Sequence, residues 1–213
     1  MTYPIFIKLE GRPCLIVGGG KIALGKALPM LSAGARLTVV SPKFLPEFEA
    51  LQNTVLRHRP FEPNDMAGAF LAVAATDDPA VNRAVAEACR ANGILCNVVD
   101  APDLCDFHVP SVLDRGPLAI AISTAGEAPA LAKRLRRDLE DLFPEDYADY
   151  VGFLGWVRER VRERATDRAV RERIAAEFAS REGYERFKRA TPAEREAWVS
   201  ERVAGLATGD ERS

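Results

Sequence analysis

The sequence has no apolar stretch long enough to cross a bilayer. Its first residues, MTYPIFIKLEGRP, lack the apolar run and small-residue cleavage site of a secretory signal. The sequence also lacks a large excess of charge of one sign, because 31 acidic and 29 basic residues leave a net charge of −2. That balance favours neither a nucleic acid nor a membrane surface as a partner. We therefore expect a soluble, cytoplasmic protein.

Residues that bind metals are scarce. The two histidines, His58 and His108, lie far apart in the chain, and the four cysteines form no C-x-x-C pair. The four cysteines are Cys14, Cys89, Cys96 and Cys105, and three of them lie in or beside apolar runs. We expect buried free thiols and no resident metal site.

Short apolar runs alternate with helical stretches over the first 123 residues. Strands are predicted at 14–17, 36–40, 54–58, 70–75, 94–99 and 118–123. A helix is predicted over about 20–33, and Asp78-Pro79 is typical of an N-cap followed by proline at the first helical position. Continuous apolar strands separated by helices are typical of a parallel sheet covered on both faces. The sequence thus predicts a Rossmann-like, doubly wound α/β fold.

The remainder of the chain has only helical periodicity. A helix is predicted from Pro129 to Pro144, with one leucine-rich face formed by Leu131, Leu135, Leu139 and Leu142. Beyond it, arginine and glutamate are dense. One apolar face is expected from Val157, Val161, Ala165 and Ala169. A capping box at 191–194 predicts a last helix.

Residues 15–28 read LIVGGGKIALGKAL and match two phosphate-binding motifs. GGGKIA, from Gly18, matches the dinucleotide fingerprint G-x-G-x-x-G/A, whereas GKIALGK, from Gly20, matches most of a P-loop. A P-loop needs a hydroxyl after its lysine to hold Mg²⁺, and Ala27 stands there. Strand, glycine turn and helix in that order favour a dinucleotide. Gly18 then permits the turn, and Gly20 lets the backbone approach the pyrophosphate. A glycine turn without a ligand is the simpler alternative.

One feature of dinucleotide-binding folds is missing. The second strand usually ends in an acidic residue that binds the ribose 2′-hydroxyl, but here that place reads Val40-Ser41-Pro42-Lys43. Ser41 can hydrogen-bond a hydroxyl but carries no charge, and Lys43 suits a 2′-phosphate. These residues leave NAD and NADP both open.

Ligands of open α/β sheets lie at the carboxyl ends of the strands. Besides the glycine turn, the candidates there are Ser41, Thr76, Val98, Asp100, Ser123 and Thr124. Asp100 follows the fifth strand at the expected nicotinamide region, so it is our candidate general base; a simple turn aspartate is the alternative. His108 follows on a loop near the same edge.

The segment 123–139 is similar to a second anion site, with an ordinary strand-to-helix connection as the alternative. Tyr184 and Lys188 match the Y-x-x-x-K of short-chain dehydrogenases, but they lie in the helical part, where we expect no catalytic role. The arginines of 158–173 are interleaved with glutamates and are typical of a solvated face, although a polycarboxylate substrate would give some of them a purpose.

Several motifs together identify a family. GGGKIA, NVVDAP (97–102) and STAGEAPALA (123–132) occur in one chain. The chain resembles the precorrin-2 dehydrogenase/sirohydrochlorin ferrochelatase family, the amino-terminal half of sirohaem synthase. The likeness runs from PIFIKLEGRPCLIVGGG through VPSVLDRGPLAIAIST to the helix ending near 142, about two-thirds of the chain.

The resemblance implies NAD-dependent oxidation of precorrin-2 to sirohydrochlorin, followed in many members by insertion of Fe²⁺. It implies a homodimer formed through a central segment at 113–145. An NAD-binding Rossmann domain at 1–112 would precede this segment, and a helical C-terminal domain at 146–213 would follow it. We expect no tetrapyrrole methyltransferase half of the fused enzyme.

The resemblance also implies roles for individual residues. Asp100 is the aspartate implicated in both activities of such relatives. The implied nucleotide contacts are Gly18, Gly20, Lys21, Ile22, Ser41, Pro42 and Lys43, with Thr76 and Val98 added from the strand ends. Ser123, Thr124 and His108 are expected to contact substrate. The rival of another class is a non-catalytic, NAD-sensing Rossmann module, which would bind the nucleotide without tetrapyrrole turnover.

Overall fold

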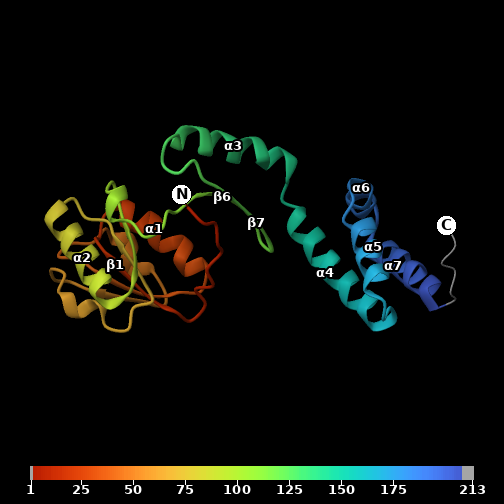
Figure 1. Ribbon diagram of the computed structural model, residues 1–213, viewed down its shortest axis with the longest axis horizontal. Coiled ribbons are helices and arrows are strands. Elements are labelled where there is room, and N and C mark those ends of the chain that lie inside the picture. Colours follow the sequence, from red (N-terminus) through yellow and green to blue (C-terminus); the bar gives the residue numbers. More distant parts are fainter. Residues whose placement is uncertain (1, 208–213) are drawn as a thin grey trace. The chain divides into compact units, whose positions relative to one another are not determined.

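The computed structural model describes residues 2–207, which fall into two compact units (Figure 1). The first unit is the chain up to Val109 together with Ala125–Glu127. The second comprises Pro110–Thr124 and the chain from Ala128 onward. The three domains expected at 1–112, 113–145 and 146–213 stay a prediction, and 208–213 lie outside the described residues.

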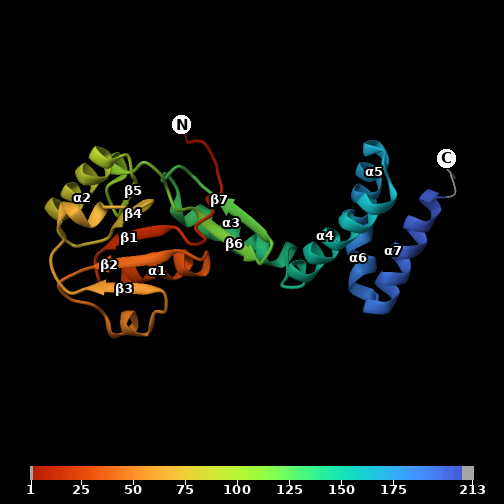
Figure 2. The ribbon, with the colours of Figure 1, turned by 90° about the horizontal axis from the view of Figure 1, so that it is seen from below.

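A five-stranded parallel sheet forms the centre of the first unit, in the order β3-β2-β1-β4-β5. Figure 2 shows β3, β2 and β1 side by side. The strands are β1 (Pro13–Val17), β2 (Arg36–Val40), β3 (Thr54–Arg57), β4 (Leu71–Ala74) and β5 (Leu95–Val98). All four pairings are parallel, which confirms the Rossmann-like fold class predicted from the sequence.

Helices cover both faces of this sheet because successive side chains of a strand point to opposite sides. Leu15 and Val17 of β1 belong to the core cluster that includes α2 (Pro79–Asn92), whereas Cys14 and Ile16 belong to the cluster that includes α1 (Lys21–Ser32). All four side chains are almost fully buried. Two apolar layers therefore hold the sheet rigid beneath its strand ends.

Several of the connections between the strands and helices contain a single 3₁₀ turn. These turns are η1 (Pro46–Ala50), η2 (Pro63–Met66) and η3 (Pro102–Leu104). The predicted N-cap of α2 is confirmed, because the Asp78 carboxylate accepts hydrogen bonds from the N–H groups of Ala80 and Val81 at 2.8 and 3.4 Å.

The strand predicted at 118–123 is confirmed, but its place as the sixth strand of the parallel sheet is wrong. Residues 118–122 form β7 (Leu118–Ile122), which pairs antiparallel with β6 (Ser111–Arg115) in a separate two-stranded sheet of the second unit. Only Gly116 and Pro117 join the two strands. Such a loop closes a hairpin, whereas a parallel neighbour needs a crossover of a dozen residues or more. The strand β6 itself was missed because its sequence, SVLDR, is short and ends in charges.

As far as Ala207, where the described residues end, the second unit also contains five helices: α3 (Pro129–Leu142), α4 (Tyr147–Arg164), α5 (Arg168–Phe178), α6 (Arg181–Arg189) and α7 (Pro192–Ala207). The helix expected from Pro129 is thereby confirmed. Arg115 ties the hairpin to the end of α3, because its Nε donates to the Phe143 carbonyl at 2.8 Å. The helical core is built around Val157, Phe178 and Trp198.

One predicted helix face is interrupted. Val157, Val161 and Ala165 are buried as expected, but α4 ends at Arg164 and Ala169 is exposed on the next helix. Asp167 starts that helix, because its carboxylate accepts the Ala169 N–H at 2.7 Å. The capping box of the last helix is confirmed by reciprocal hydrogen bonds between Thr191 and Glu194.

The cysteines are free thiols, as predicted. Cys14, Cys89 and Cys96 are buried, and burial raises the pKa of the Cys14 thiol to about 11, whereas Cys105 is only half-buried. Within residues 2–207, no helix is both long enough and apolar enough to span a bilayer.

Candidate functional site

A cleft of about 1380 Å³ opens at the carboxyl ends of the strands in the first unit. The glycine turn after β1, the loop after β2, the turn after β4 and the residues after β5 all line it. The predicted site residues that the structure brings together there are Gly18, Gly20, Lys21, Ile22, Ser41, Pro42, Lys43, Thr76 and Asp100. The structure therefore has a cleft at the carboxyl ends of the strands, where the sequence predicted the ligand site.

The three glycines of the turn differ in what surrounds them. A Cβ on Gly18, whose φ is +127°, would lie 2.2 Å from the Ala75 carbonyl oxygen, and a Cβ on Gly19 would lie 2.1 Å from the Lys43 carbonyl oxygen. A Cβ on Gly20 would meet nothing within 4 Å. Packing inside the protein thus requires glycine at the first two positions, whereas the third faces open space at the cleft. Gly19 was missed because its constraint comes from a distant loop.

The N-terminus of α1 lies at this turn without a cap. Gly20 is the N-cap residue, no side chain accepts a hydrogen bond there, and the first turn has no acidic residue. In contrast, Asp78 caps α2 in the same cleft. Unsatisfied N–H groups and the helix dipole favour an anion, and a pyrophosphate supplies one. Together with the open space at Gly20, this fits a dinucleotide.

The end of β2 is organised by a buried serine. The Ser41 hydroxyl donates to the Lys43 carbonyl at 2.7 Å, and the Leu45 N–H donates to the Gly19 carbonyl at 2.9 Å. These bonds join the loop after β2 to the glycine turn. Because the single hydroxyl proton of Ser41 is committed to Lys43, Ser41 can only accept a further hydrogen bond. Lys43 is exposed and is the charged side chain by which this loop lines the cleft.

A polar pair joins the turn after β4 to helix α2. The Thr76 hydroxyl donates to Asn82 Oδ1 at 2.8 Å, and Asn82 is 7% exposed. Asn82 lines the cleft but was not predicted from the sequence, because an asparagine inside a helix resembles an ordinary surface residue. Val98 is buried at the end of β5 and does not line the cleft; the lining residue there is Val99. The strand period of two explains this difference.

Asp100 lies at the cleft in an unusual backbone conformation. Its φ is +58°, which a residue with a Cβ adopts rarely and at a cost, although aspartate and asparagine tolerate it best. The side chain is exposed, so its carboxylate can meet a bound molecule. His108 is also exposed but is not among the residues that line this cleft.

The remaining predicted residues, Ser123 and Thr124, belong to the second unit. The Thr124 hydroxyl accepts the Ala128 N–H at 3.2 Å, directly before α3. It thus satisfies a backbone group at the helix start, the structural alternative considered for this segment.

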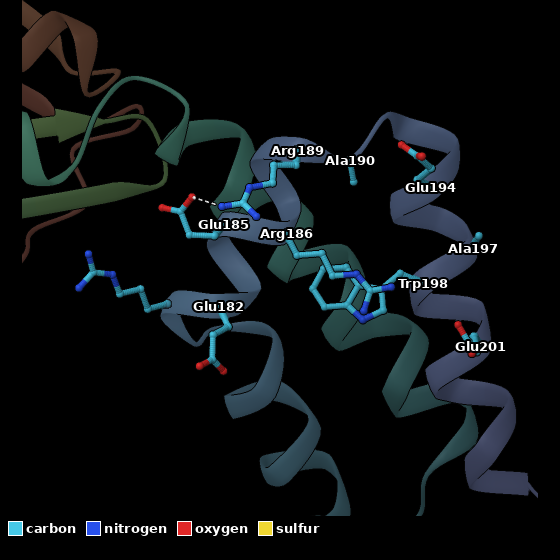
Figure 3. A pocket seen from close by; sticks show the side chains of 10 residues that line it. Glu182, Glu185, Arg186, Arg189, Ala190, Glu194, Ala197, Trp198 and Glu201 are labelled. Atoms are coloured by element: carbon cyan, nitrogen blue, oxygen red, sulfur yellow. Dashed lines mark ion pairs between the residues drawn. The ribbon is translucent and has the colours of Figure 1, made fainter.

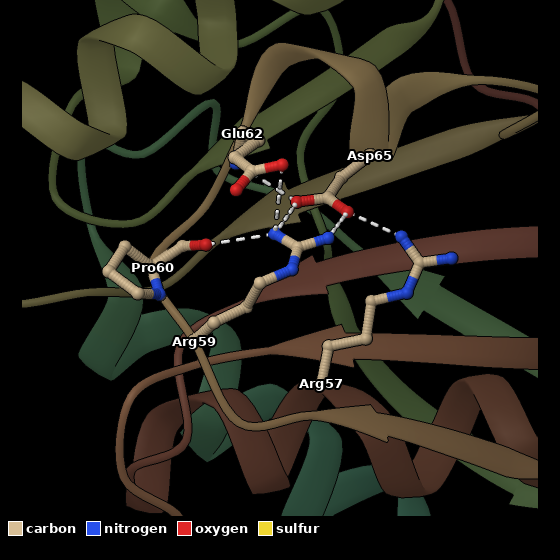
Figure 4. A network of polar contacts seen from close by, with 5 residues as sticks. All are labelled: Arg57, Arg59, Pro60, Glu62 and Asp65. Carbon is tan, nitrogen blue, oxygen red and sulfur yellow. Dashed lines mark hydrogen bonds and ion pairs between the residues drawn. The ribbon is translucent and has the colours of Figure 1, made fainter.

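A buried ion cluster fixes another wall of the cleft. Arg57 and Arg59 both bind the Asp65 carboxylate, which also accepts the Glu62 N–H at 2.9 Å (Figure 4). Arg59 donates further to the Pro60 carbonyl at 2.9 Å, and Pro60 lines the cleft. Burial alone would raise the pKa of Asp65, but these hydrogen bonds outweigh it and hold the pKa at about 2.

This cluster predicts a stability change with pH. Because the pKa of Asp65 is lower in the folded protein, its stabilisation of about 2 kcal/mol is present above the unfolded value of about 3.9 and is lost as the pH falls towards 2. Asp65→Asn should lower the free energy of unfolding by about that amount at neutral pH and remove this acid dependence. Glu62→Gln, in an exposed pair, is the matched control and should cost under about 0.5 kcal/mol. Denaturant titrations from pH 2 to 7 check this; equal effects of the two variants would contradict it.

A second hollow, of about 780 Å³, lies between α6 and α7 (Figure 3). Three arginines and four glutamates line it, and the Arg186 guanidinium lies 4.3 Å from the centroid of the Trp198 ring. The balanced charges give this hollow no preference for anions. Tyr184 of the Y-x-x-x-K pattern is largely buried, and its hydroxyl donates to Asp146 at 2.7 Å, which gives it a structural role.

Among the described residues, no three His, Cys, Asp or Glu side chains are grouped closely enough to hold a metal ion.

Comparison with known families agrees with this geometry. A family model described as "Putative NAD(P)-binding" matches residues 5–111, and one described as "Sirohaem biosynthesis protein central" matches residues 115–142. The chain belongs to the putative NAD(P)-binding family, whose model covers half of it, and its central segment matches the sirohaem biosynthesis model. Its cofactor is a nicotinamide dinucleotide, which decides against the P-loop alternative.

Individual relatives extend the likeness. The siroheme synthase of Methylobacillus flagellatus is 49% identical over 166 residues, 76% of this chain and 36% of that protein. The siroheme synthase of Pseudomonas paraeruginosa is 40% identical over 214 residues, 97% of this chain and 46% of that protein. The chain thus spans less than half the length of these sirohaem family relatives. A solved structure titled SirC, precorrin-2 dehydrogenase, matches with a TM-score of 0.77 and 26% identity, covering 96% of this chain and all of that one.

Proposed function

We propose that the protein oxidises precorrin-2 to sirohydrochlorin with NAD⁺ as the electron acceptor. The observation that carries the proposal is the likeness to the precorrin-2 dehydrogenase SirC, which extends over the whole of that chain. The geometry of the cleft supports the proposal independently, because an uncapped helix N-terminus and an exposed carboxylate line the same cleft. The non-catalytic sensor module would need the first of these features but not the second.

The glycine turn and the start of α1 would hold the pyrophosphate of NAD through backbone N–H groups of Lys21 and Ile22. Pro42 and Lys43 would border the adenosine ribose, with Thr76 beneath the other half of the nucleotide. The loop after β2 places no carboxylate against a ribose, so discrimination against NADP would rest on shape rather than on charge repulsion. We propose NAD as the natural cofactor on the family likeness.

The reaction removes a hydride and a proton from the reduced macrocycle. When bound, NAD⁺ supplies the acceptor for the hydride from a meso carbon. Asp100 then acts as the base that takes the proton from a pyrrole nitrogen, because its carboxylate is exposed in the cleft. The sheet fixes the backbone just before Asp100, because the Val99 N–H donates to the Ala74 carbonyl at 2.9 Å.

The experiment that tests the proposal measures initial rates with anaerobic precorrin-2 under three conditions: NAD⁺, NADP⁺ and no nucleotide. We expect sirohydrochlorin to form with NAD⁺, more slowly with NADP⁺, and at the protein-free rate without nucleotide. Equal rates with and without nucleotide would contradict the proposal. Adding Fe²⁺ afterwards tests the chelatase that the resemblance implies, through metal loading faster than in a protein-free control.

We also propose that the protein is a homodimer formed through the hairpin and α3. Apolar side chains remain exposed on these elements, notably Val112 on β6, and Leu131 and Leu142 on α3. Exposed apolar area of this kind is typical of an interface. We expect light scattering to give twice the chain mass, and Leu131→Asp to yield monomers. A monomeric wild-type protein at micromolar concentration would contradict this.

A further inference from the structure

Asn82 is one of few polar side chains buried in the described part of the chain, and it faces the cleft from the first turn of α2. The other buried polar side chains are Ser41, Asp65 and Asn97, and each of them holds a loop in place. Burying a carboxamide is costly unless its donor and acceptor are both satisfied. Its partners therefore indicate what Asn82 is for.

All of the hydrogen bonds of the Asn82 side chain go to one residue, Thr76. Its Oδ1 accepts from the Thr76 N–H at 3.2 Å and from the Thr76 hydroxyl at 2.8 Å, while its Nδ2 donates to the Thr76 carbonyl at 3.0 Å. A carboxamide presents a donor and an acceptor side by side, as a peptide group does. Asn82 thus pairs with Thr76 as a neighbouring strand would, just where β4 leaves the sheet.

The residue before Thr76 supports the glycine turn. The Ala75 carbonyl oxygen is the atom that would lie 2.2 Å from a Cβ on Gly18, and the Ala75 N–H donates to the Val17 carbonyl at 2.8 Å. The turn after β1 therefore packs directly on the chain that Asn82 holds. A shift of Thr76 would be passed to Gly18 and from there to the N-terminus of α1.

We propose that Asn82 is a positioning residue of the nucleotide site: through Thr76 and Ala75 it fixes the glycine turn at which the dinucleotide pyrophosphate binds. The inference rests on the proposed nucleotide site. Its effect falls on dinucleotide affinity and not on the macrocycle, because the side-chain hydrogen bonds of Asn82 all go to Thr76 in the turn after β4. Replacing it with alanine removes three hydrogen bonds and takes the partner from the half-buried N–H and C=O groups of Thr76.

The same helix offers a matched control. Asn92, at the end of α2, is exposed, and its Nδ2 donates to the Ala88 carbonyl at 2.8 Å. Asn92→Ala makes the same chemical change, but this residue does not line the cleft. A difference between the two variants therefore reports the position of Asn82 and not the loss of an asparagine from α2.

The test is calorimetric titration of the full-length protein with NAD⁺, together with the KM for precorrin-2 and kcat at saturating NAD⁺. We expect Asn82→Ala to raise the Kd for NAD⁺ by about tenfold. The KM for precorrin-2 should stay within about twofold, and Asn92→Ala should change none of these values. A folded Asn82→Ala protein that binds NAD⁺ like the wild type would overturn the inference, as would an equal loss in Asn92→Ala.

A second variant keeps the inference testable if Asn82→Ala does not fold. Thr76→Val retains the branched shape but loses the 2.8 Å bond to Asn82 Oδ1, together with the contacts of this hydroxyl with the backbone of Asp78. We expect it to raise the Kd for NAD⁺ by about threefold, and an unchanged Kd would count against the role of the pair. Wild-type protein that fails to bind NAD⁺ would instead refute the proposed nucleotide site itself.

Discussion

Asp100→Asn will lower kcat for precorrin-2 oxidation by about a hundred- to ten-thousandfold and leave the Kd for NAD⁺ nearly unchanged. The amide has the shape of the carboxylate but cannot take up the pyrrole proton. Asparagine is chosen because the φ of +58° at this position would strain alanine, whereas asparagine tolerates it. Single-turnover rates under anaerobic conditions measure the loss.

The control for this variant is Asp103→Asn, three positions further on. Asp103 is an exposed carboxylate in η3 that does not line the cleft. The Asp103→Asn protein should oxidise precorrin-2 at the wild-type rate. If Asp100→Asn retains a rate within threefold of the wild type, Asp100 is not the base and the proton must leave by another route.

The second large effect is expected in the glycine turn. Alanine should affect stability at its first two positions and NAD⁺ affinity at the third. Gly18→Ala and Gly19→Ala should each destabilise the fold by at least about 3 kcal/mol, since the new Cβ would meet a backbone carbonyl at 2.2 or 2.1 Å. Gly20→Ala should fold normally, because nothing in the protein lies near its Cβ. Its added methyl group would enter the space proposed for the pyrophosphate and raise the Kd for NAD⁺ by at least about tenfold.

Gly25→Ala provides the matched control for these substitutions. Gly25 lies inside α1, and a Cβ there would also meet nothing. Alanine should therefore stabilise the protein by about 1 kcal/mol through helix propensity and leave NAD⁺ binding intact. Thermal unfolding and NAD⁺ titration of the four variants check the series. Normal NAD⁺ affinity in Gly20→Ala would place the pyrophosphate elsewhere.

Much of the fold could be predicted because local patterns determine it. The apolar strands, the N-cap at Asp78 and the capping box at Thr191 each depend on a few neighbouring residues. The hairpin at 111–122 was missed as such because an apolar strand does not reveal its partner. Only the short connection Gly116-Pro117 excludes a parallel pairing of these two strands.

The site was predicted less completely, because its geometry depends on contacts between distant segments. Gly19 is constrained by Lys43, and Gly18 by Ala75, and neither neighbour is visible in the motif. The sequence also cannot indicate that the hydroxyl proton of Ser41 is already committed to a backbone carbonyl. A motif therefore predicts which turn binds the nucleotide, whereas long-range packing decides what each residue in it does.

The most direct test of the account is a stoichiometry. Excess protein is mixed anaerobically with precorrin-2 and NAD⁺, and the absorption of sirohydrochlorin and of NADH are recorded together. The account predicts one NADH for each sirohydrochlorin, at a rate that Asp100→Asn lowers. Intact protein that binds NAD⁺ but leaves precorrin-2 unchanged would contradict it and favour the non-catalytic sensor module.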